Sequence, residues 1–206
     1  LIVGAHNEGI EQYRNIQLPV VSIERLVSKD IPVVAADNYA GGVLATQQLL
    51  DDGCQHIIHT NYPHDLASPN MERRRAYEEL MRRHGLPMYT YEVSFDSSTA
   101  EKIKIFYRLF DEHPEVDGVF ADNDTNASLI MQVARKRGRR VPEDLKVVGF
   151  DGANMTRTLL PELTTIQQPI QQMATAAVQL LQDQIDGKKT TNSVQLPVKL
   201  IHGTTA

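Results

Sequence analysis

Carboxylate and amide side chains follow two short apolar runs in the second half of this chain. The first run leads into Asp122, Asn123 and Asp124, and the second leads into Asp151. Asp124 and Asp151 could act as the acid and base of glycoside hydrolysis, because that reaction uses two carboxylates at one crevice. Two such carboxylates are also what a non-catalytic sugar site needs, since they accept charge-assisted hydrogen bonds from hydroxyl groups. The residue types leave both kinds of chemistry open.

The elements around these residues predict where the site lies. Both apolar runs, residues 118–121 and 146–150, are of strand length, and residues 125–137 between them are of helix length. In open α/β sheets, ligands bind in the crevice outside the carboxyl ends of the strands. We therefore expect the acidic and amide groups to line one polar site at that edge of a sheet.

The rest of the chain repeats this rhythm. We expect further strands at residues 33–36, 57–60, 89–93 and 194–201, and further helices at residues 41–52, 70–84, 98–113 and 169–186. Most of these helices stop at a glycine or just before a proline, and Ser98 with Glu101 matches a capping box. Alternating strands and helices of this length predict an α/β fold with parallel sheets.

Composition excludes several classes of protein. With 206 residues, 41% of them hydrophobic, the chain can bury a sizeable core in one large domain or two lobes. The net charge of −5 gives no overall footprint for nucleic acid or a membrane, and no apolar run approaches the roughly 20 residues of a transmembrane helix. The single Cys54 rules out an internal disulfide, and no signal peptide is visible. We expect a cytoplasmic protein that does not contact a membrane.

The amino terminus suggests that this chain is part of a longer protein. Residues 1–4 look like the end of a buried strand, and a loop at residues 6–9 and a short helical stretch follow. No initiating methionine is present. We expect the chain to be a fragment or to lack its front.

Six motifs run through nearly the whole chain. They are residues 37–42 (DNYAGG), 73–77 (RRRAY), 120–124 (FADND), 141–144 (VPED), 147–151 (VVGFD) and 161–169 (PELTTIQQP). As a set and in this order they resemble the LacI/GalR family of bacterial sugar-responsive transcription regulators. The loop at residues 4–7 is most similar to that of sucrose-operon repressors. Ala76 and Gly152 depart from the family pattern, which usually has Gly and Asp at these positions.

The resemblance implies a two-lobed, periplasmic-binding-protein-like (type I) α/β fold, with parallel sheets flanked by helices and an incomplete amino-terminal lobe. Residues 1–60 and 166–190 would form part of the amino-terminal lobe of an effector-binding domain. Residues 61–165 and 191–206 would form its carboxy-terminal lobe. A sugar would lie between the lobes, which would hinge around it. Operator DNA would be bound through an amino-terminal helix-turn-helix that these residues do not contain.

The resemblance also identifies candidate ligand-binding residues. It places a sugar-binding carboxylate at Asp124 and a pocket guanidinium at Arg73. Asp151 and Gln168 end the remaining cleft-facing segments, Tyr39 and Phe95 could stack on a sugar face, and Asn123 is a further candidate.

Each candidate has a plainer interpretation that the sequence leaves open. Asp124 could cap the following helix, a role for which Asp122 and Asn123 also compete. Arg73 lies in a basic run of the kind that usually forms a solvated helix face. Asp151 could be a turn residue and Gln168 a helix-start residue, while the two aromatic residues could belong to the core.

The histidines and the second basic run give weaker evidence of a functional site. His56 and His59, with His64 and Asp65, do not have metal-ligand spacing, so we expect no metal site, and no motif calls for a cofactor. The basic run at residues 135–140 could contact nucleic acid. We favour the interpretation that it closes a helix, whose carboxyl end attracts cations.

We therefore predict the sugar-binding and dimerisation domain of a LacI-type repressor of a carbohydrate operon, and not an enzyme. The ligand would be a neutral or phosphorylated sugar, with sucrose the first choice. The alternatives are a sugar-binding protein of a transport system, a carbon-catabolite regulator that binds a phosphoprotein, and a sugar hydrolase.

A homodimer is expected because the family reads pseudo-palindromic operators. We expect the helix after Asp124 to contribute to the dimer contact. It carries two apolar rows, made of Leu129, Ile130 and Val133, and of Ala127, Met131 and Ala134.

Overall fold

The computed structural model describes residues 1–4, 18–63, 69–188 and 190–206. Contacts divide the chain into two compact units, each built from two segments. The smaller unit contains Leu1–Asn38 and Pro169–Val198, and the larger unit contains Tyr39–Gln168 and Lys199–Ala206. The loop expected at residues 6–9 and the helical stretch after it lie outside the described residues.

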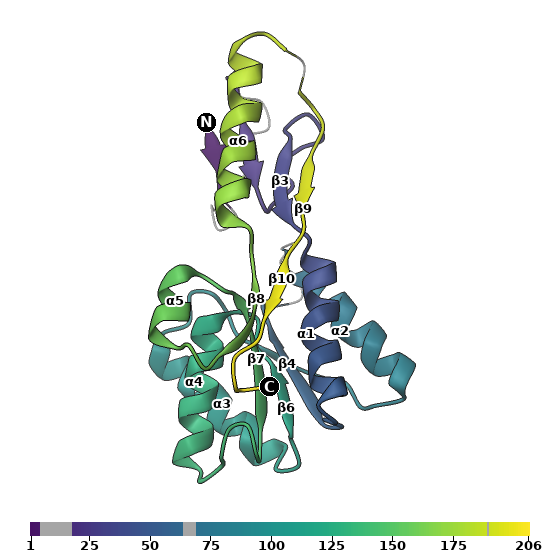
Figure 1. Ribbon diagram of the computed structural model, residues 1–206, viewed down its shortest axis with the longest axis vertical. Coiled ribbons are helices and arrows are strands. Elements are labelled where there is room, and N and C mark those ends of the chain that lie inside the picture. The colour runs from purple at the N-terminus through teal and green to yellow at the C-terminus, as the bar shows by residue number, and fades with distance from the viewer. Residues whose placement is uncertain (5–17, 64–68, 189) are drawn as a thin grey trace. The chain divides into compact units, whose positions relative to one another are not determined.

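Over its described residues, the smaller unit is a four-stranded sheet with one long helix packed against it. In spatial order, its parallel strands are β1 (Ile2–Val3), β2 (Val21–Ile23), β3 (Val33–Ala36) and β9 (Val194–Leu196). Helix α6 (Ile170–Ile185) packs against β2, β3 and β9 (Figure 1). It buries Met173 and Ala177.

The larger unit is a six-stranded sheet with helices on both faces. In spatial order, its strands are β10 (Lys199–Ile201), β8 (Thr164–Gln167), β7 (Lys146–Asp151), β6 (Gly118–Phe120), β4 (Ile57–Asn61) and β5 (Tyr89–Glu92). Neighbours are parallel except at one edge, where β10 runs antiparallel to β8. Its helices are α1 (Asn38–Asp51), α2 (Asn70–His84), α3 (Thr99–Glu112), α4 (Asp124–Lys136) and α5 (Asn154–Leu159). Figure 1 shows α1 and α2 on one face of the sheet and α3 and α4 on the other.

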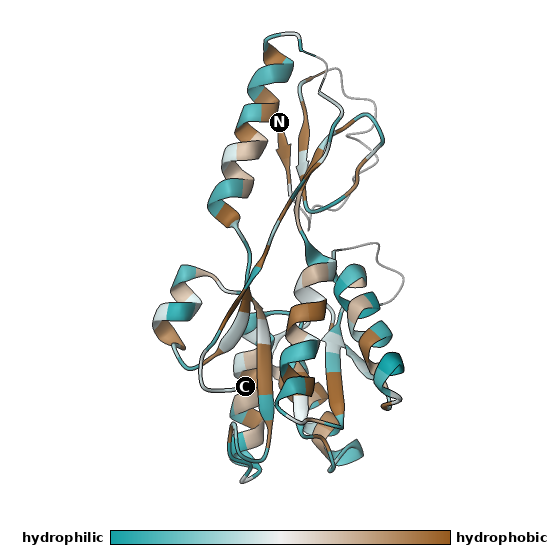
Figure 2. Ribbon diagram, turned by 45° about the vertical axis from the view of Figure 1, so that its right-hand side comes forward, coloured by the Kyte–Doolittle hydropathy of each residue, from teal (hydrophilic) through white to brown (hydrophobic). Residues whose placement is uncertain are grey.

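The central strands of the larger unit are covered on both faces, so β6 reads as a continuous apolar run, whereas β4 also buries the hydrogen-bonded side chains of His59, Thr60 and Asn61. Every residue of β4 and β6 is buried, and Figure 2 shows the apolar colouring of the central strands. On one face, Phe106, Leu109 and Ile130 of α3 and α4 belong to the main core cluster. On the other face, Gly41 lets α1 approach closely, because a β-carbon there would lie 2.6 Å from the Phe150 ring.

Local signals predicted several helix ends correctly. Helix α2 spans the predicted residues 70–84, and Gly85 follows it in a left-handed conformation with φ of 66°. Ser98 and Glu101 form the predicted capping box at the start of α3. The Ser98 N–H donates to the Glu101 carboxylate at 2.8 Å, and the Glu101 N–H donates to the Ser98 hydroxyl at 3.3 Å.

The predicted strand at residues 194–201 is wrong as a single element. Pro197 separates β9, in the sheet of the smaller unit, from β10, in the sheet of the larger unit. Proline has no N–H to donate to a strand ladder, so it interrupts the strand where the chain changes sheets. Strands β2 and β8 and the short helix α5 were not predicted.

The division between the units differs from the predicted lobe boundaries. Strand β4 pairs with β5 and β6, so the first boundary lies after Asn38 rather than near residue 60. Residues 191–198 belong to the smaller unit, because β9 pairs with β3. The identity of the two units with the two lobes of the resembled family stays a prediction.

The two apolar rows of α4 are not available for a dimer contact. All six residues are at most 8% exposed, and they pack against α3 and the sheet within the larger unit. The helix has apolar surface on two sides because it lies between β7 and α3. This part of the dimer prediction is wrong.

The last residues of the chain form hydrogen bonds with both β7 and β8. The Thr205 hydroxyl donates a hydrogen bond to the Val147 carbonyl at 2.6 Å and accepts one from the Thr164 N–H at 2.9 Å. Both contacts are at the amino ends of these strands. The carboxyl ends of these strands lie at the opposite edge of the sheet, where Asp151 ends β7 and Gln168 follows β8.

Candidate ligand-binding site

The strand order of the larger unit creates a switch point between β4 and β6. The chain leaves β4 to form β5 on one side, and then returns past β4 to form β6 on the other side. Connections that diverge in this way leave a crevice at the carboxyl ends of the strands, where α/β proteins bind ligands. Tyr62 follows β4 at this edge, and Asp122 follows β6.

Asp122 is fully buried and is the centre of a hydrogen-bonded network beneath this edge. Its Oδ1 accepts hydrogen bonds from Thr60 Oγ1 at 2.6 Å and Asn126 Nδ2 at 2.7 Å, and its Oδ2 accepts one from Asn123 Nδ2 at 2.8 Å. Burial raises the pKa of Asp122, while the hydrogen bonds from Asn126 and Thr60 oppose that shift. Asp122 therefore joins β4, β6 and the start of α4.

Arg73 of α2 lies inside this network. It is 5% exposed, its Nη1 donates to the Asp122 carbonyl oxygen at 2.7 Å, and its Cζ lies 3.5 Å from the centre of the Phe150 ring. The flat guanidinium can stack and donate in its plane at the same time, which a lysine could not do. Arg75, from the same basic run, pairs instead with Glu72 at 2.6 Å and is half-exposed. The fold thus separates the candidate pocket arginine from a solvated one.

Asn123, and not Asp124, caps helix α4. The Asn123 side chain accepts a hydrogen bond from the Asn126 N–H at 2.8 Å. The competing cap interpretation of Asp124 is therefore wrong, and its carboxylate points elsewhere. Asp124 Oδ1 accepts from the Thr165 hydroxyl at 2.5 Å, and Oδ2 accepts from the Gly152 N–H at 2.9 Å.

Asp124 is a desolvated acid. It is 4% exposed, and burial raises its pKa from 3.8 to about 6, an effect that the charge of Asp151 reinforces. The hydrogen bond from Thr165 opposes the shift. Position 149 must be a glycine for Asp124 to lie here, because a β-carbon on residue 149 would lie 2.5 Å from Asp124 Oδ1.

Asp151 and Gln168 meet at the ends of β7 and β8. Gln168 Nε2 donates to Asp151 Oδ1 at 2.8 Å, and the Gln168 N–H donates to the Asp151 carbonyl at 3.0 Å. Asp151 has a φ of 111°, a conformation that side chains rarely adopt and that costs about 1–3 kcal/mol. The next residue, Gly152, donates its N–H to Asp124. Strained residues of this kind cluster at ligand sites, which favours a functional interpretation of Asp151 over that of a simple turn residue.

The two aromatic candidates, Tyr39 and Phe95, have different surroundings. The Tyr39 hydroxyl donates to Glu79 at 2.6 Å, and the Arg75 guanidinium lies 4.2 Å from the Tyr39 ring centre. Those contacts are with the outer part of α2, so the structure does not bring Tyr39 together with Asp124. Phe95 is 52% exposed, and its ring centre lies 6.3 Å from that of Tyr62.

Tyr62 is a site candidate that sequence reasoning missed. Burial, reinforced by the carboxylates of Asp122 and Asp151 and opposed by Arg73, raises the pKa of Tyr62 to about 12. The phenol therefore lies within electrostatic reach of the polar network. Its position directly after the predicted strand at residues 57–60 was the available signal, the same one that identified Asp122.

The remaining polar clusters have structural partners. His59 is fully buried, its Nδ1 lies 2.9 Å from the Phe120 carbonyl, and burial lowers its pKa to about 3. In the basic run at residues 135–140, Arg137 pairs with Asp111 at 2.6 Å and Arg140 pairs with Asp144 at 2.8 Å. His64 and Asp65 lie outside the described residues, and among those described no group of three or more His, Cys, Asp or Glu could hold a metal.

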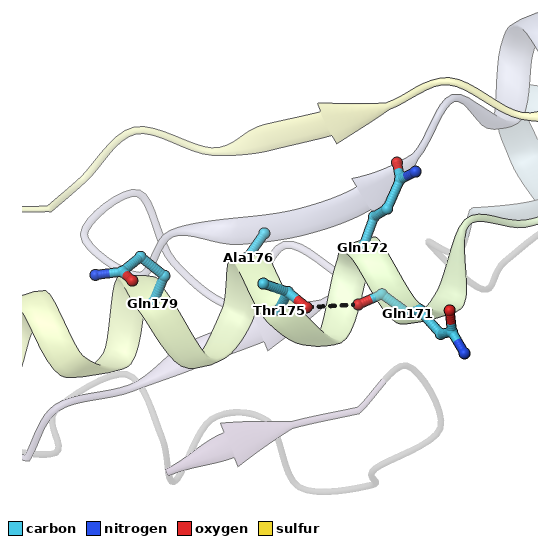
Figure 3. A pocket seen from close by; sticks show the side chains of 5 residues that line it. All are labelled: Gln171, Gln172, Thr175, Ala176 and Gln179. Carbon is cyan, nitrogen blue, oxygen red and sulfur yellow. Dashed lines mark hydrogen bonds between the residues drawn. The ribbon is translucent and has the colours of Figure 1, made fainter.

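A separate hollow of about 550 Å³ lies on α6 in the smaller unit (Figure 3). Its lining comes from one helix: Gln171, Gln172, Thr175, Ala176 and Gln179. None of these side chains is charged, and the Thr175 hydroxyl is bonded to the Gln171 carbonyl of its own helix at 3.0 Å. Ligand sites usually combine groups from several elements, as the strand-end network does.

Comparison with known proteins defines the class of this chain. Residues 46–206 match the periplasmic binding protein-like domain family. The chain belongs to that family. No helix within the described ranges is long and apolar enough to cross a membrane.

Two relatives and a solved structure place the chain more narrowly. It is 39% identical over 209 residues to a sucrose operon repressor of Pediococcus pentosaceus, with 100% of this chain and 64% of the relative covered. It is 35% identical over 192 residues to a ribose operon repressor of Halalkalibacterium halodurans, with 93% and 57% covered. A periplasmic binding protein/LacI transcriptional regulator from Alkaliphilus metalliredigens, solved with D-xylulofuranose, superposes with a TM-score of 0.88 at 29% identity, over 100% of this chain and 77% of that one.

These similarities identify a LacI/GalR-type effector-binding domain. The chain spans about three fifths of the length of the two repressors.

Proposed function

We propose that this chain is the sugar-binding core of a DNA-binding repressor that controls a carbohydrate operon, with sucrose as the first candidate ligand. The observation that carries the proposal is the network at the ends of β4, β6, β7 and β8. It combines a stacked guanidinium, Arg73, with the carboxylates of Asp124 and Asp151 and the amide of Gln168. Such groups pair with the vicinal hydroxyls of a sugar.

The charge balance of this network favours a neutral sugar over a sugar phosphate. The network contains three carboxylates, from Asp122, Asp124 and Asp151, and one guanidinium, that of Arg73. Arg73 is already engaged with the Asp122 carbonyl and the Phe150 ring. A phosphate dianion would therefore enter a site with excess negative charge, whereas hydroxyl groups can donate to those carboxylates.

The proposal extends to the whole protein through its relatives. Both relatives are operon repressors rather than enzymes, so we infer a regulator that binds operator DNA in the cytoplasm as a homodimer. Two-fold symmetric operators are read by paired heads, which is the physical reason for the dimer. A gel-shift titration of the longer protein at fixed salt, with and without sucrose, tests this part. Operator binding that no sugar alters would contradict it.

Calorimetric titration tests the ligand. The chain is titrated with sucrose, fructose, ribose and fructose 6-phosphate. We expect saturable binding of a neutral sugar that is tighter than binding of the phosphate ester. Heat only from the phosphate ester would overturn the choice of a neutral ligand, and no heat from any sugar would overturn the proposed function.

A matched pair of variants links binding to this site. Asp151→Asn removes one carboxylate charge from the network and should weaken sugar binding about tenfold, the value of one hydrogen bond to a charged group. Asp111→Asn is the control, because Asp111 is 63% exposed and pairs with Arg137 on the surface. Equal sugar affinity in both variants would remove Asp151 from the site.

A further inference from the structure

Two aromatic side chains, Tyr62 and Phe95, contact each other edge to face beside the polar network. Tyr62 directly follows β4 and Phe95 lies shortly after β5, and these strands are neighbours in the sheet. The ring centres are 6.3 Å apart and the ring planes meet at 77°. Phe95 is 52% exposed, so its ring offers contact area at the same edge as the carboxylates. Such edge-to-face pairs are favourable arrangements of aromatic rings.

The phenol of Tyr62 links this aromatic pair to the polar groups. Its pKa responds to Asp122, Arg73 and Asp151 as well as to burial, and the side chain of Asn70 is hydrogen-bonded to it. Asn70 lies at the start of α2, one turn before Arg73. Tyr62 therefore stands between Phe95 on one side and the network on the other.

The width of the sheet edge bears on how large a ligand can contact both the aromatic pair and the polar network. Neighbouring strands lie about 4.8 Å apart, so the four steps from β5 to β8 span about 19 Å. Gln168 and Asp151 lie at the β7–β8 end of this span, and Phe95 lies at the β5 end. Tyr62 follows β4, two strand spacings or about 10 Å from Asp151 on β7, so one sugar ring covers only part of this shorter distance, whereas two linked rings can contact both residues.

We propose that Tyr62, together with Phe95, forms a second sugar subsite that binds one ring of a disaccharide while the polar network binds the other. The inference rests on the proposed function and deepens it. It makes Tyr62 the residue that distinguishes a disaccharide from a single-ring sugar. Aromatic walls with a few placed polar groups are the usual composition of small-molecule sites.

The test compares two sugar sizes in matched variants. Tyr62→Ala and Tyr62→Phe are titrated calorimetrically with sucrose and with fructose. Tyr62→Ala should weaken sucrose binding about tenfold, because an aromatic contact is lost, and should change fructose binding less than about threefold. Tyr62→Phe keeps the ring and should retain most of the affinity for sucrose.

Tyr107 supplies the control. It lies on α3 with its ring 5.1 Å from the guanidinium of Arg137, at the carboxyl end of α4 and therefore at the far edge of the sheet from the site. Tyr107→Ala and Tyr107→Phe should leave both affinities unchanged. The unfolding midpoint of each variant shows whether it is folded.

A spectroscopic signal detects direct contact. The chain contains 7 tyrosines and no tryptophan, so its near-ultraviolet absorbance above 270 nm reports mainly on tyrosine. Sucrose should produce a tyrosine difference spectrum in the wild type and in Tyr107→Phe, and most of it should disappear in Tyr62→Phe. This readout decides the question even if Tyr62→Ala fails to fold.

The outcomes separate this inference from the proposed function. If the wild type binds no sugar, both are wrong. If it binds sucrose but Tyr62→Ala binds it equally well, or loses sucrose and fructose to the same extent, only the second subsite is wrong. A sucrose difference spectrum that persists in Tyr62→Phe, or a wild type that binds only single-ring sugars, would also overturn it.

Discussion

Exchanging Asp124 for asparagine should move protein stability and sugar affinity in opposite directions. The Asp124 carboxylate is 4% exposed; it accepts hydrogen bonds from Thr165 and Gly152, and the Thr156 side chain is also hydrogen-bonded to it. An asparagine can keep the contacts with Thr165 and Gly152. Its oxygen can accept from the Gly152 N–H, and its amide can donate to the Thr165 hydroxyl, which rotates to accept. Asp124→Asn therefore removes a buried charge and keeps the hydrogen bonds to Thr165 and Gly152.

The raised pKa of Asp124 gives the sign and the size of the stability effect. The pKa rises from 3.8 to about 6, chiefly because of burial, so the folded state holds this proton more tightly than the unfolded state does. The stabilisation is complete below pH 3.8 and is lost as the pH rises to about 6. The difference corresponds to about 3 kcal/mol of unfolding free energy. A neutral asparagine has no charge to desolvate, so the variant should be more stable at pH 7 by about 1–3 kcal/mol.

Binding should respond in the other direction. If the Asp124 carboxylate accepts a hydrogen bond from a sugar hydroxyl, its replacement should cost about 1.5–3 kcal/mol of binding free energy. A gain in stability with a loss of binding is the usual trade-off at a functional site.

Urea unfolding at several pH values and calorimetric titration at pH 7 measure both effects. The wild type should lose more stability than Asp124→Asn between about pH 4 and pH 6, because the variant keeps only the contribution of Asp122, whose pKa is also raised by burial. Asp124→Ala is the contrasting variant, because it leaves the Gly152 N–H and the Thr165 hydroxyl without their acceptor and should lose about 1–3 kcal/mol. An asparagine variant that is less stable than the wild type at pH 7 would refute the desolvation argument, and unchanged sugar affinity would exclude Asp124 from the site.

Two further predictions concern parts of the larger unit away from the site. Thr205→Val keeps the shape of the side chain but removes its hydrogen bonds to Val147 and Thr164, so urea unfolding should show a loss of about 1–3 kcal/mol; an unchanged midpoint would show that the tail does not fasten β7 to β8. Cys54 is 4% exposed and burial raises its pKa to about 12, so a thiol reagent at pH 8 should label it only after unfolding, and rapid labelling of the folded protein would contradict this.

The sequence by itself determined the elements whose signals are local. Helix α2 begins and ends where predicted because Gly85 can adopt the left-handed conformation that ends a helix. The capping box of Ser98 and Glu101 joins residues three apart, so no other part of the chain is needed to form it. The polar residues at the ends of β6 and β7 could also be predicted from the sequence, because each group directly follows a short apolar run that indicates a buried strand.

Only the tertiary structure decided which residues act together. The choice of Asn123 over Asp124 as the helix cap depends on Thr165 and Gly152, which draw the Asp124 carboxylate away. Tyr62 comes within electrostatic reach of Asp122 because the strand order places β4 beside β6, although the two residues are far apart in sequence.

Two predictions were wrong because they depended on contacts between segments that are distant in the sequence. The apolar rows of α4 have the periodicity of an interface, but periodicity cannot show whether α3 or a second subunit covers them. Residues 194–201 read as one strand because strand propensity is local, whereas the sheet that each half joins is set by hydrogen bonds to β3 and to β8. Hydrogen bonds and packing between distant segments carry this information, and no short stretch of sequence contains it.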